Sequence, residues 1–259
     1  MKNLKIILIA LMVAFATQTN AQTADEIIDN YFENTGGEDN WNKIEGLKMS
    51  AKVNQGGMEI PIEVIQLKGG KQMTVISFQG MKMYQGVFDG ETLWGTNFQT
   101  QKAEKNDAET TAMMKLESND FPDSFLNYKD KGYTVELMGK EEINGTEAFK
   151  IKLVKEPVMV DGKEEDNISY YFFDTENYVP IAMQSEVKMG PTKGTTQEIT
   201  FSDYQEVEGV YLPFSMTQGT KGGASQPITF DSIEINPEVD DKAFMFPEEA
   251  TTTEEKDKN

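Results

Sequence analysis

The sequence predicts a mainly β fold, built from an antiparallel sheet whose strands are joined by hairpins. Three observations support this prediction. Runs of alternating apolar and polar residues recur through most of the chain, Gly-containing turns separate these runs at regular spacing, and residues 169–216 contain two similar hairpins in succession. Both faces of several runs carry apolar groups, as in Met73–Phe78, so the sheet is expected to be covered on two sides or to close around something.

The two successive hairpins have the same pattern. An aromatic or β-branched run, Ser169–Asp174 in the first and Ile199–Asp203 in the second, leads through a turn into a run that opens Tyr-aliphatic-Pro, Tyr178–Met183 or Tyr211–Met216. Proline in a sheet is confined to strand starts, edges and bulges. The proline of each second run is therefore predicted to mark the start of a return strand.

The N-terminus has the features of a secretory signal peptide over residues 1–21. Lysines precede an apolar run from Ile6 to Phe15, and Ala21 is a small residue at the expected cleavage site. The alternative is an uncleaved signal anchor, which would need a longer apolar run. The sequence contains no Cys, so lipid attachment and disulfides are excluded. We expect a chain that is exported in soluble, non-lipidated form to the periplasm.

The overall charge limits the class of partner. The formal net charge is −20, and every basic residue is Lys, since the sequence contains no Arg. Such acidity repels nucleic acid and anionic membrane surfaces, so nucleic-acid binding is not expected. The absence of guanidinium groups also argues against bidentate clamps for phosphate or carboxylate.

The first elements of the mature chain are predicted in order. Thr23–Thr35 has helical spacing of apolar residues, Asp25 as a plausible N-cap and glycines at its end. A short segment at Trp41–Ile44 follows. The period then changes to two, which predicts five strands. These strands are expected at Leu47–Val53, Met58–Leu67, Gln72–Phe78, Lys82–Phe88 and Glu91–Phe98, the first two forming a hairpin.

The strand pattern stops at Asn106–Tyr128, which predicts one or two inserted helices capped by Asp107 or Asp120. The apolar side of this segment is rich in Met. Two explanations are compatible: a core helix that packs on the sheet, or a mobile lid over an apolar cavity, because Met suits adaptable surfaces as well as core gaps.

Strands resume after the insertion. We expect a strand at Tyr133–Met138, a tight turn at Asn144-Gly145, where a type I′ turn needs positive φ at both residues, and a strand at Glu147–Lys155. The remaining predicted elements are an acidic loop at Asp161–Asn167, the two hairpins, a strand at Pro227–Ile235, an apolar clip at Phe244–Pro247 and a disordered acidic tail at residues 248–259.

The composition excludes much catalytic chemistry. With neither His nor Cys, the chain cannot form a Ser-His-Asp triad, a Cys nucleophile or a His/Cys zinc site. No Gly-rich segment has the spacing of a phosphate loop. Paired carboxylates remain possible in principle, and Asp161–Asn167 could hold Ca²⁺ loosely, but it lacks EF-hand spacing and a solvated loop is favoured. We predict no catalytic residues, cofactor or metal.

The positive signal is apolar. The chain has 15 Met and 15 Phe, many of them on the second face of strands whose first face is also apolar. A thick ordinary core explains this pattern, and so does an internal cavity for an apolar ligand. A buried acyl chain would contribute about 0.8 kcal/mol per CH₂ without any charged contact, so binding such a ligand is physically feasible.

Several of these segments together resemble the LolA-like family of periplasmic outer-membrane lipoprotein-sorting proteins, in a Bacteroidetes-like version. The resemblance rests on Phe173-Asp174, the Tyr178-Val-Pro180 strand start, Ile199–Asp203, Val210–Pro213 and Phe244–Pro247. The signal peptide and the helix at Thr23–Thr35 also match. The resemblance covers residues 22–247, although its motifs are loose and mainly structural.

The resemblance implies a fold and a function. The fold would be a curved antiparallel half-barrel, that is, an incomplete β-barrel, with an N-terminal helix and with lid helices at Asn106–Tyr128. The implied protein is a monomeric periplasmic carrier that shields lipoprotein acyl chains, or another lipid, in outer-membrane lipoprotein sorting, with envelope sorting proteins as partners. An alternative is an envelope sensor or interaction module on the same fold. The family's carriers have an arginine near the cavity mouth, which this sequence cannot match.

Candidate residues for the ligand cavity follow from the strand pattern and this resemblance. They are Ile60, Ile62, Met73, Val75, Met113, Leu116, Phe125, Phe149, Ile151, Tyr170, Phe172, Ile181 and Met183. The last four assume one choice of which strand face points inward. A one-residue change of register would reverse that choice for every side chain of the strand.

Overall fold

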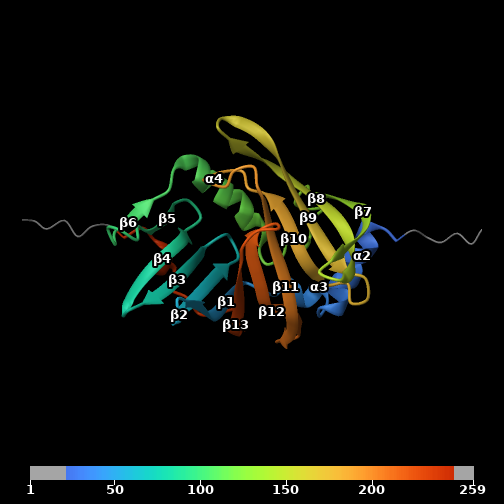
Figure 1. Cartoon of the computed structure of the whole chain (residues 1–259), viewed down its shortest axis with the longest axis horizontal. Helices are drawn as coiled ribbons and strands as arrows, with labels where there is room; N and C mark the ends of the chain where they lie inside the picture. Colours follow the sequence, from blue (N-terminus) through green and yellow to red (C-terminus); the bar gives the residue numbers. More distant parts are fainter. Residues whose placement is uncertain (1–21, 248–259) are drawn as a thin grey trace, which may run out of the picture.

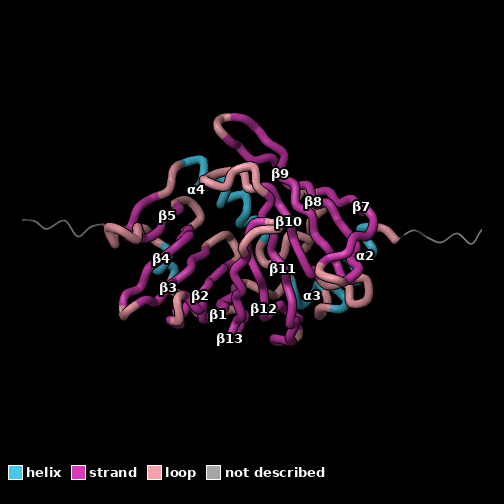
Figure 2. The backbone as a smooth tube through the Cα atoms, in the orientation of Figure 1, coloured by secondary structure: helices cyan, strands magenta, loops and turns pink. Residues whose placement is uncertain are grey.

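The structure is a computed structural model that describes residues 22–247. The predicted signal peptide and acidic tail lie outside the described residues. Within residues 22–247, 13 antiparallel strands form one sheet, which Figure 1 shows from β6 at one edge to β7 at the other. The two edge strands do not pair with each other, so the sheet is a half-barrel. The predicted mainly β half-barrel is confirmed, and strands dominate Figure 2.

The chain builds the sheet in two meanders that meet in its interior. The first runs from β1 out to the edge at β6, and the second runs from the opposite edge at β7 back to β13, which pairs with β1. The strands of the first meander are β1 (Gly46–Gln55), β2 (Met58–Leu67), β3 (Gln72–Phe78), β4 (Met81–Phe88), β5 (Leu93–Thr96) and β6 (Ala103–Lys105). Those of the second are β7 (Thr134–Ile143), β8 (Thr146–Val160), β9 (Lys163–Asp174), β10 (Pro180–Glu186), β11 (Thr196–Val207), β12 (Val210–Thr220) and β13 (Ser225–Ile235).

Helices cover one face of the sheet, which we call the inner face. Helix α2 (Ala24–Asn34) and the short α3 (Glu38–Trp41) pack on it through Ile27, Ile28, Tyr31, Phe32 and Trp41, all of which are buried in the main core. Helix α4 (Ala108–Glu117) contacts both β5 and β8, so it crosses between the two arms of the sheet, at the top of Figure 1. None of its side chains is fully buried.

The C-terminal segment covers part of the opposite, outer face. It contains the 3-10 helix η2 (Asp241–Phe244), whose Phe244 is fully buried. Phe244 packs in a second core with Met73, Val75 and Trp94, and the indole N–H of Trp94 donates to the carbonyl of Phe244 at 2.9 Å. The predicted apolar clip is therefore present, on the outer face of the first meander.

Helix α2 lies within the predicted segment Thr23–Thr35, but its N-cap is two residues earlier than predicted. Its N-cap is Thr23 rather than Asp25: the Thr23 hydroxyl accepts from the backbone N–H of Glu26, and the Glu26 carboxylate accepts from the backbone N–H of Thr23. This reciprocal capping box satisfies two backbone donors, whereas an Asp25 cap would satisfy one.

The insertion is less helical than predicted. Helix α4 begins after Asp107, whose carboxylate accepts from the backbone N–H of Thr110 at 2.7 Å, and a 3-10 turn η1 (Ser118–Asp120) follows it. Residues 121–133 then form a loop instead of a second helix. The residue before a proline is disfavoured in helical conformation, and Pro122 follows directly on Phe121.

The prediction of an acidic loop at Asp161–Asn167 is wrong, because most of this segment belongs to strand β9. Asp161 and Gly162 have φ values of 52° and 73° and form a two-residue turn of the kind confirmed at Asn144-Gly145. Lys163 onward continues as strand, paired with the end of β8. Residues 163–167 contain no apolar side chain, so no alternation reveals the two-residue period of the strand.

Two smaller strand predictions also need correction. Glu91–Phe98 is not one strand: β5 ends at Thr96, the Asn97 side chain accepts from the N–H groups of Gln99 and Thr100, and this turn leads into β6. Pro180 starts β10 as predicted, but Pro213 lies inside β12. Pro213 is accommodated because the pairing of β12 with β13 begins only at Ser215, so the proline lies beyond the ladder on that side.

Candidate functional site

An apolar cavity of about 460 Å³ lies between the inner face of the central strands and the segments that cover them. Its volume falls within the range of about 300–1,000 Å³ that is typical of small-molecule sites. Most of its lining is apolar. The lining residues are Tyr31, Trp41, Leu47, Met49, Ala51, Ile62, Val64, Gln66, Asp120, Pro122, Asp123, Ser124, Tyr171, Pro180, Phe201, Tyr204, Leu212, Pro213, Met216, Gln218, Ile228, Phe230 and Ile233.

The sheet wall of the cavity comes from both sides of the β1–β13 pairing. On β1 and β2, Met49 pairs with Val64 and Ala51 pairs with Ile62, so these side chains share one face. On the other side, Phe201, Met216 and Ile228 form a matching row across β11, β12 and β13. Alternation along each strand thus gathers apolar side chains from five strands on one surface.

The N-terminal helices close one side of the cavity. Tyr31 and Trp41 have ring centroids 6.0 Å apart, and Tyr31 also meets Phe173 of β9 edge to face at 5.7 Å. The indole N–H of Trp41 donates to the hydroxyl of Thr35 at 3.1 Å, which holds the ring in place. These ring contacts and this hydrogen bond fix where the two aromatic side chains lie in the wall.

The loop after η1 brings a carboxylate to the cavity. Asp123 accepts from the hydroxyl of Tyr31 at 3.0 Å and from the backbone N–H of Phe125 at 2.7 Å, while the Lys131 ammonium donates to its backbone carbonyl. Burial raises the pKa of the Asp123 carboxyl above its ordinary value, although the Phe125 and Tyr31 hydrogen bonds act in the opposite direction. Burial likewise raises the pKa of the Tyr31 hydroxyl.

The raised pKa of Asp123 predicts how stability depends on pH. Because folding disfavours the charged carboxylate, the protonated form contributes stability that is present below the ordinary pKa and is lost as pH rises through the folded-state pKa. As pH falls from neutral, wild type should therefore gain free energy of unfolding relative to Asp123→Asn. Urea unfolding over a pH series measures this difference.

An exposed carboxylate provides the control for this experiment. Asp231 lies on β13 and is exposed, so the pH dependence of Asp231→Asn should run parallel to that of wild type. A constant difference in unfolding free energy between wild type and Asp123→Asn across the series would contradict the assignment to Asp123.

Asp120 lies where the apolar cavity meets two polar grooves. Its carboxylate forms an ion pair with Lys155 at 2.6 Å and accepts from the hydroxyl of Tyr133 at 3.0 Å. The side chains of Lys155 and Asp120 are only 12% and 18% exposed. Asp120 lines the cavity, a groove of about 390 Å³ beneath α4 and a smaller groove of about 100 Å³ beside Gln72.

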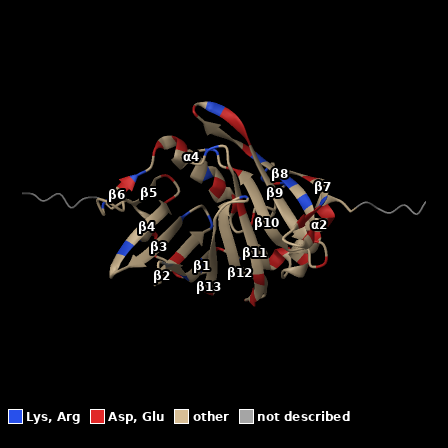
Figure 3. Cartoon of the chain, in the orientation of Figure 1, with Lys and Arg blue, Asp and Glu red and all other residues tan. Residues whose placement is uncertain are grey.

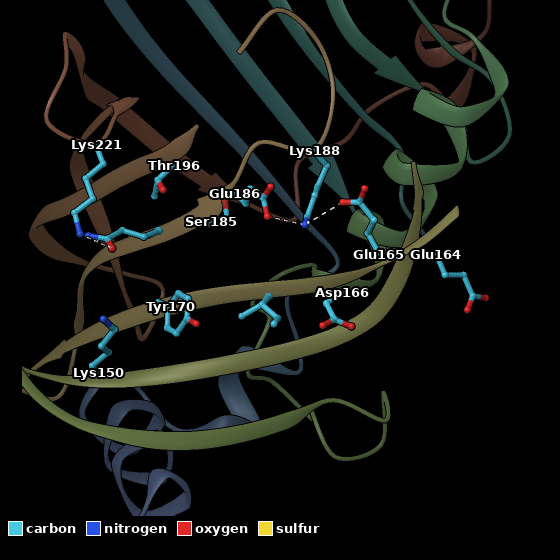
Figure 4. Close-up of a pocket in the computed structure, with 12 residues that line it drawn as sticks. Lys150, Glu164, Glu165, Asp166, Tyr170, Ser185, Glu186, Lys188, Thr196 and Lys221 are labelled. Atoms are coloured by element: carbon cyan, nitrogen blue, oxygen red, sulfur yellow. Dashed lines mark hydrogen bonds and ion pairs between the residues drawn. The ribbon is translucent and has the colours of Figure 1, made fainter. Parts of the chain in front are cut away.

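A larger hollow, of about 760 Å³, lies on the outer face between β9 and β10 (Figure 4). Charged side chains line much of it, and Lys188 bridges it by pairing with Glu186 at 2.8 Å and Glu165 at 3.3 Å. These groups satisfy one another at the surface. We regard the smaller apolar cavity as the candidate site, because ligand sites are mostly apolar with a few placed polar groups.

The candidate residues from the sequence fall into four groups. Ile62 lines the cavity and Ile60 shares its face on β2, whereas Phe125, Phe149 and Ile151 are buried in the main core around it. Met113 and Met183 line the groove beneath α4, and Leu116 lies on α4, partly exposed. The remaining candidates lie on the outer face: Met73 and Val75 beneath Phe244, and Tyr170, Phe172 and Ile181 in a separate cluster.

On β9, the face that points inward is the opposite of the one predicted. Tyr171, not Tyr170, lines the cavity, and Phe173, not Phe172, packs in the main core. Tyr170 and Phe172 instead lie under the Lys150 ammonium, whose distances to the two ring centroids are 5.1 and 5.4 Å. Four aromatic residues in succession carry no alternation that would decide between the faces.

Sequence reasoning missed most of the cavity lining. The alternation of Leu47, Met49 and Ala51 on β1 is a signal that could have assigned them to an inward face. The contribution of Tyr31 and Trp41 from the helices has no comparable signal. Asp120 and Asp123 were hidden among the 44 acidic residues of the sequence. Within residues 22–247, Figure 3 shows acidic positions on strands, helices and turns alike.

The described residues were also searched for metal-ligand groups and for helices that could span a membrane. Within residues 22–247, no group of three or more carboxylates could hold a metal ion together. In the same range, no helix is both long and apolar enough to cross a membrane.

No protein-family model matches the sequence, and the search of curated proteins gives no match. Solved structures do match. A DUF1329 family protein from Desulfovibrio piger is similar with a TM-score of 0.52 at 13% identity, over 85% of this chain and 96% of that one. A LolA superfamily protein from Nitrosomonas europaea is similar with a TM-score of 0.51 at 11% identity, over 87% and 98%. The resemblance predicted from the sequence is confirmed at the level of the fold.

Proposed function

We propose that this chain, whose fold is LolA-like, is a periplasmic binding protein that shields acyl chains in its inner-face cavity, as a carrier in outer-membrane lipoprotein sorting. The observation that carries the proposal is the 460 Å³ apolar cavity between the sheet and its helices. The site binds rather than catalyses: the sequence has no His or Cys, and the cavity carboxylates are engaged by neighbouring donors.

The energetics of this function need no charged contact. Each buried methylene contributes about 0.8 kcal/mol, so a dozen give on the order of 10 kcal/mol before the entropic cost of binding. Helix α4 supports loading and release, because its apolar side chains Met113, Met114 and Leu116 remain partly exposed. No side chain of the helix is fully buried, although the amide of Gln72 donates to the sulfur of Met114 at 2.9 Å. A segment with few buried contacts opens at low free-energy cost.

The sequence of residues 1–21 supports the periplasmic part of this proposal. The basic and apolar segments of residues 1–21 have the pattern of a cleavable signal peptide, and a chain without Cys cannot be lipidated there. An acyl carrier between two membranes would have to keep its cargo away from water, which is the role that an apolar cavity under a helical cover can perform.

Filling the cavity should weaken ligand binding. The Ile62→Trp side chain would project an indole into the cavity, so we expect affinity for the uncharged fluorophore N-phenyl-1-naphthylamine to fall about tenfold or more. Fluorescence titration of purified protein measures this affinity, and mass spectrometry of solvent extracts from natively purified protein should show a bound lipid in wild type but not in the variant.

The neighbouring residue supplies a matched control. Glu63 lies next to Ile62 on β2 and points to the outer face, where it pairs with Ser50, so Glu63→Trp adds the same indole outside the cavity. This variant should bind the fluorophore like wild type. If wild type binds neither the fluorophore nor any lipid while it captures a stable envelope protein, the function is that of an interaction module instead.

A further inference from the structure

The charged groups in the cavity lining are all acidic. Among the residues that line the 460 Å³ cavity there are two carboxylates, Asp120 and Asp123, and no lysine. The other polar groups are hydroxyls and amides, from Tyr31, Ser124, Gln66 and Gln218 among others. Any amphiphile with its chain in the cavity therefore meets acidic groups where the apolar lining ends.

The lysines near this position are already engaged. The groove beneath α4 contains Lys155, paired with Asp120 at 2.6 Å, and Lys188, paired with Glu186. The smaller groove contains Lys71, paired with Asp241 at 2.7 Å. Glu117 also lines both grooves, which adds a further carboxylate to the path that leads out of the cavity.

We propose that the site takes an acyl chain whose head group is uncharged and bears hydroxyls, as in an acylglycerol, and that it discriminates against free fatty acids of the same length. This inference rests on the proposed acyl-binding function. The oxygen atoms of Asp120 and Asp123 each retain a lone pair that accepts from a ligand hydroxyl. Because Lys155 is already paired with Asp120, a fatty acid carboxylate at the same position finds no free cation and leaves its own charge unpaired in a partly buried site.

Two ligands with the same chain test this inference: 1-monolauroylglycerol and laurate, titrated separately below their micellar concentrations. We expect the wild-type protein to bind the acylglycerol about tenfold tighter than laurate at neutral pH. The protein's overall negative charge would also disfavour laurate. Repeating the titration in about 0.5 M salt screens that long-range effect and leaves the short-range preference in place.

The Asp120→Asn variant tests whether the preference for the acylglycerol over laurate arises at this site. The variant keeps the size and one acceptor of the side chain but removes its charge and leaves the Lys155 ammonium without its partner. Affinity for laurate should rise, so that the preference falls to about threefold or less. Asp231→Asn, which removes a charge from an exposed position on β13, should retain the full preference. Asp123→Asn provides a second test that leaves the Lys155 pair intact.

The outcomes separate the two proposals. If laurate binds wild type as tightly as the acylglycerol in high salt, the head-group inference is overturned while acyl binding stands. If Asp231→Asn loses the preference as much as Asp120→Asn does, the cause is net charge and not the site. If neither ligand binds at any concentration below its micellar limit, the acyl-binding function itself fails.

Discussion

Phe173→Ala should lower the free energy of unfolding by about 3–5 kcal/mol, the usual cost of truncating a fully buried Phe. Phe173 is completely buried on the inner face of β9. Its ring meets Tyr31 of α2 at 5.7 Å and Phe125 of the loop after η1 at 5.3 Å, both edge to face. The substitution therefore leaves a cavity where a helix, a loop and the sheet all meet. Urea unfolding followed by circular dichroism measures the loss.

A surface phenylalanine gives the comparison for Phe173. Phe98 lies in the turn after β5 and is 60% exposed, so Phe98→Ala should change the free energy of unfolding by no more than about 0.5 kcal/mol. Similar losses from the two substitutions would show that Phe173 is not at the centre of the core. Because Tyr31 also lines the inner-face cavity, Phe173→Ala should weaken the proposed acyl binding as well as stability.

Phe244→Ala should detach the C-terminal segment from the outer face and cost about 3 kcal/mol or more. Phe244 is completely buried against Met73, Val75 and Trp94. The Trp94 indole is also held by its hydrogen bond to the Phe244 carbonyl. When the segment leaves, water reaches this indole. The emission of Trp94 should then shift to longer wavelength under conditions in which the wild-type spectrum is unchanged.

The tryptophan content makes this measurement specific. The sequence contains two Trp, so in a Trp41→Phe background all tryptophan emission comes from Trp94. Met245 is adjacent and 57% exposed, and Met245→Ala should leave both emission and stability unchanged. An unshifted spectrum in Phe244→Ala would show that the segment does not shield this part of the sheet.

Much of the fold could be predicted because local patterns determine hairpins. Alternation at Met58–Leu67 and Gln72–Phe78 predicted the bounds of β2 and β3. The Asn144-Gly145 dipeptide predicted the turn before β8, because both residues adopt positive φ readily, and both have it in the structure. The predictions failed where the local pattern was absent: at the charged strand that begins at Lys163, and after Pro122, where the expected helix becomes a loop. The pairing of β1 with β13 joins distant segments and has no local signal.

The candidate site was less predictable than the fold, since it depends on which strand face points inward. Ile62 was correctly placed on an alternating strand, and it lines the cavity. Tyr170 was placed on the wrong face, because the run from Tyr170 to Phe173 is apolar on both sides and each side is buried by a different layer. The engagement of Asp120 by Lys155 spans 35 residues and emerges only from tertiary packing.

The meeting of β1 and β13 inside the sheet has a consequence for how the chain folds. Leu47 pairs with Ile235, so the seam at the middle of the sheet joins nearly opposite ends of the described chain. Each meander consists of hairpins with short loops, which close quickly, whereas the seam carries the loop-closure entropy of the whole domain and is slow to form. Both sides of this seam line the cavity. The inner-face cavity is therefore incomplete until β13 has paired with β1, so a chain that has not yet formed this pairing does not have the cavity.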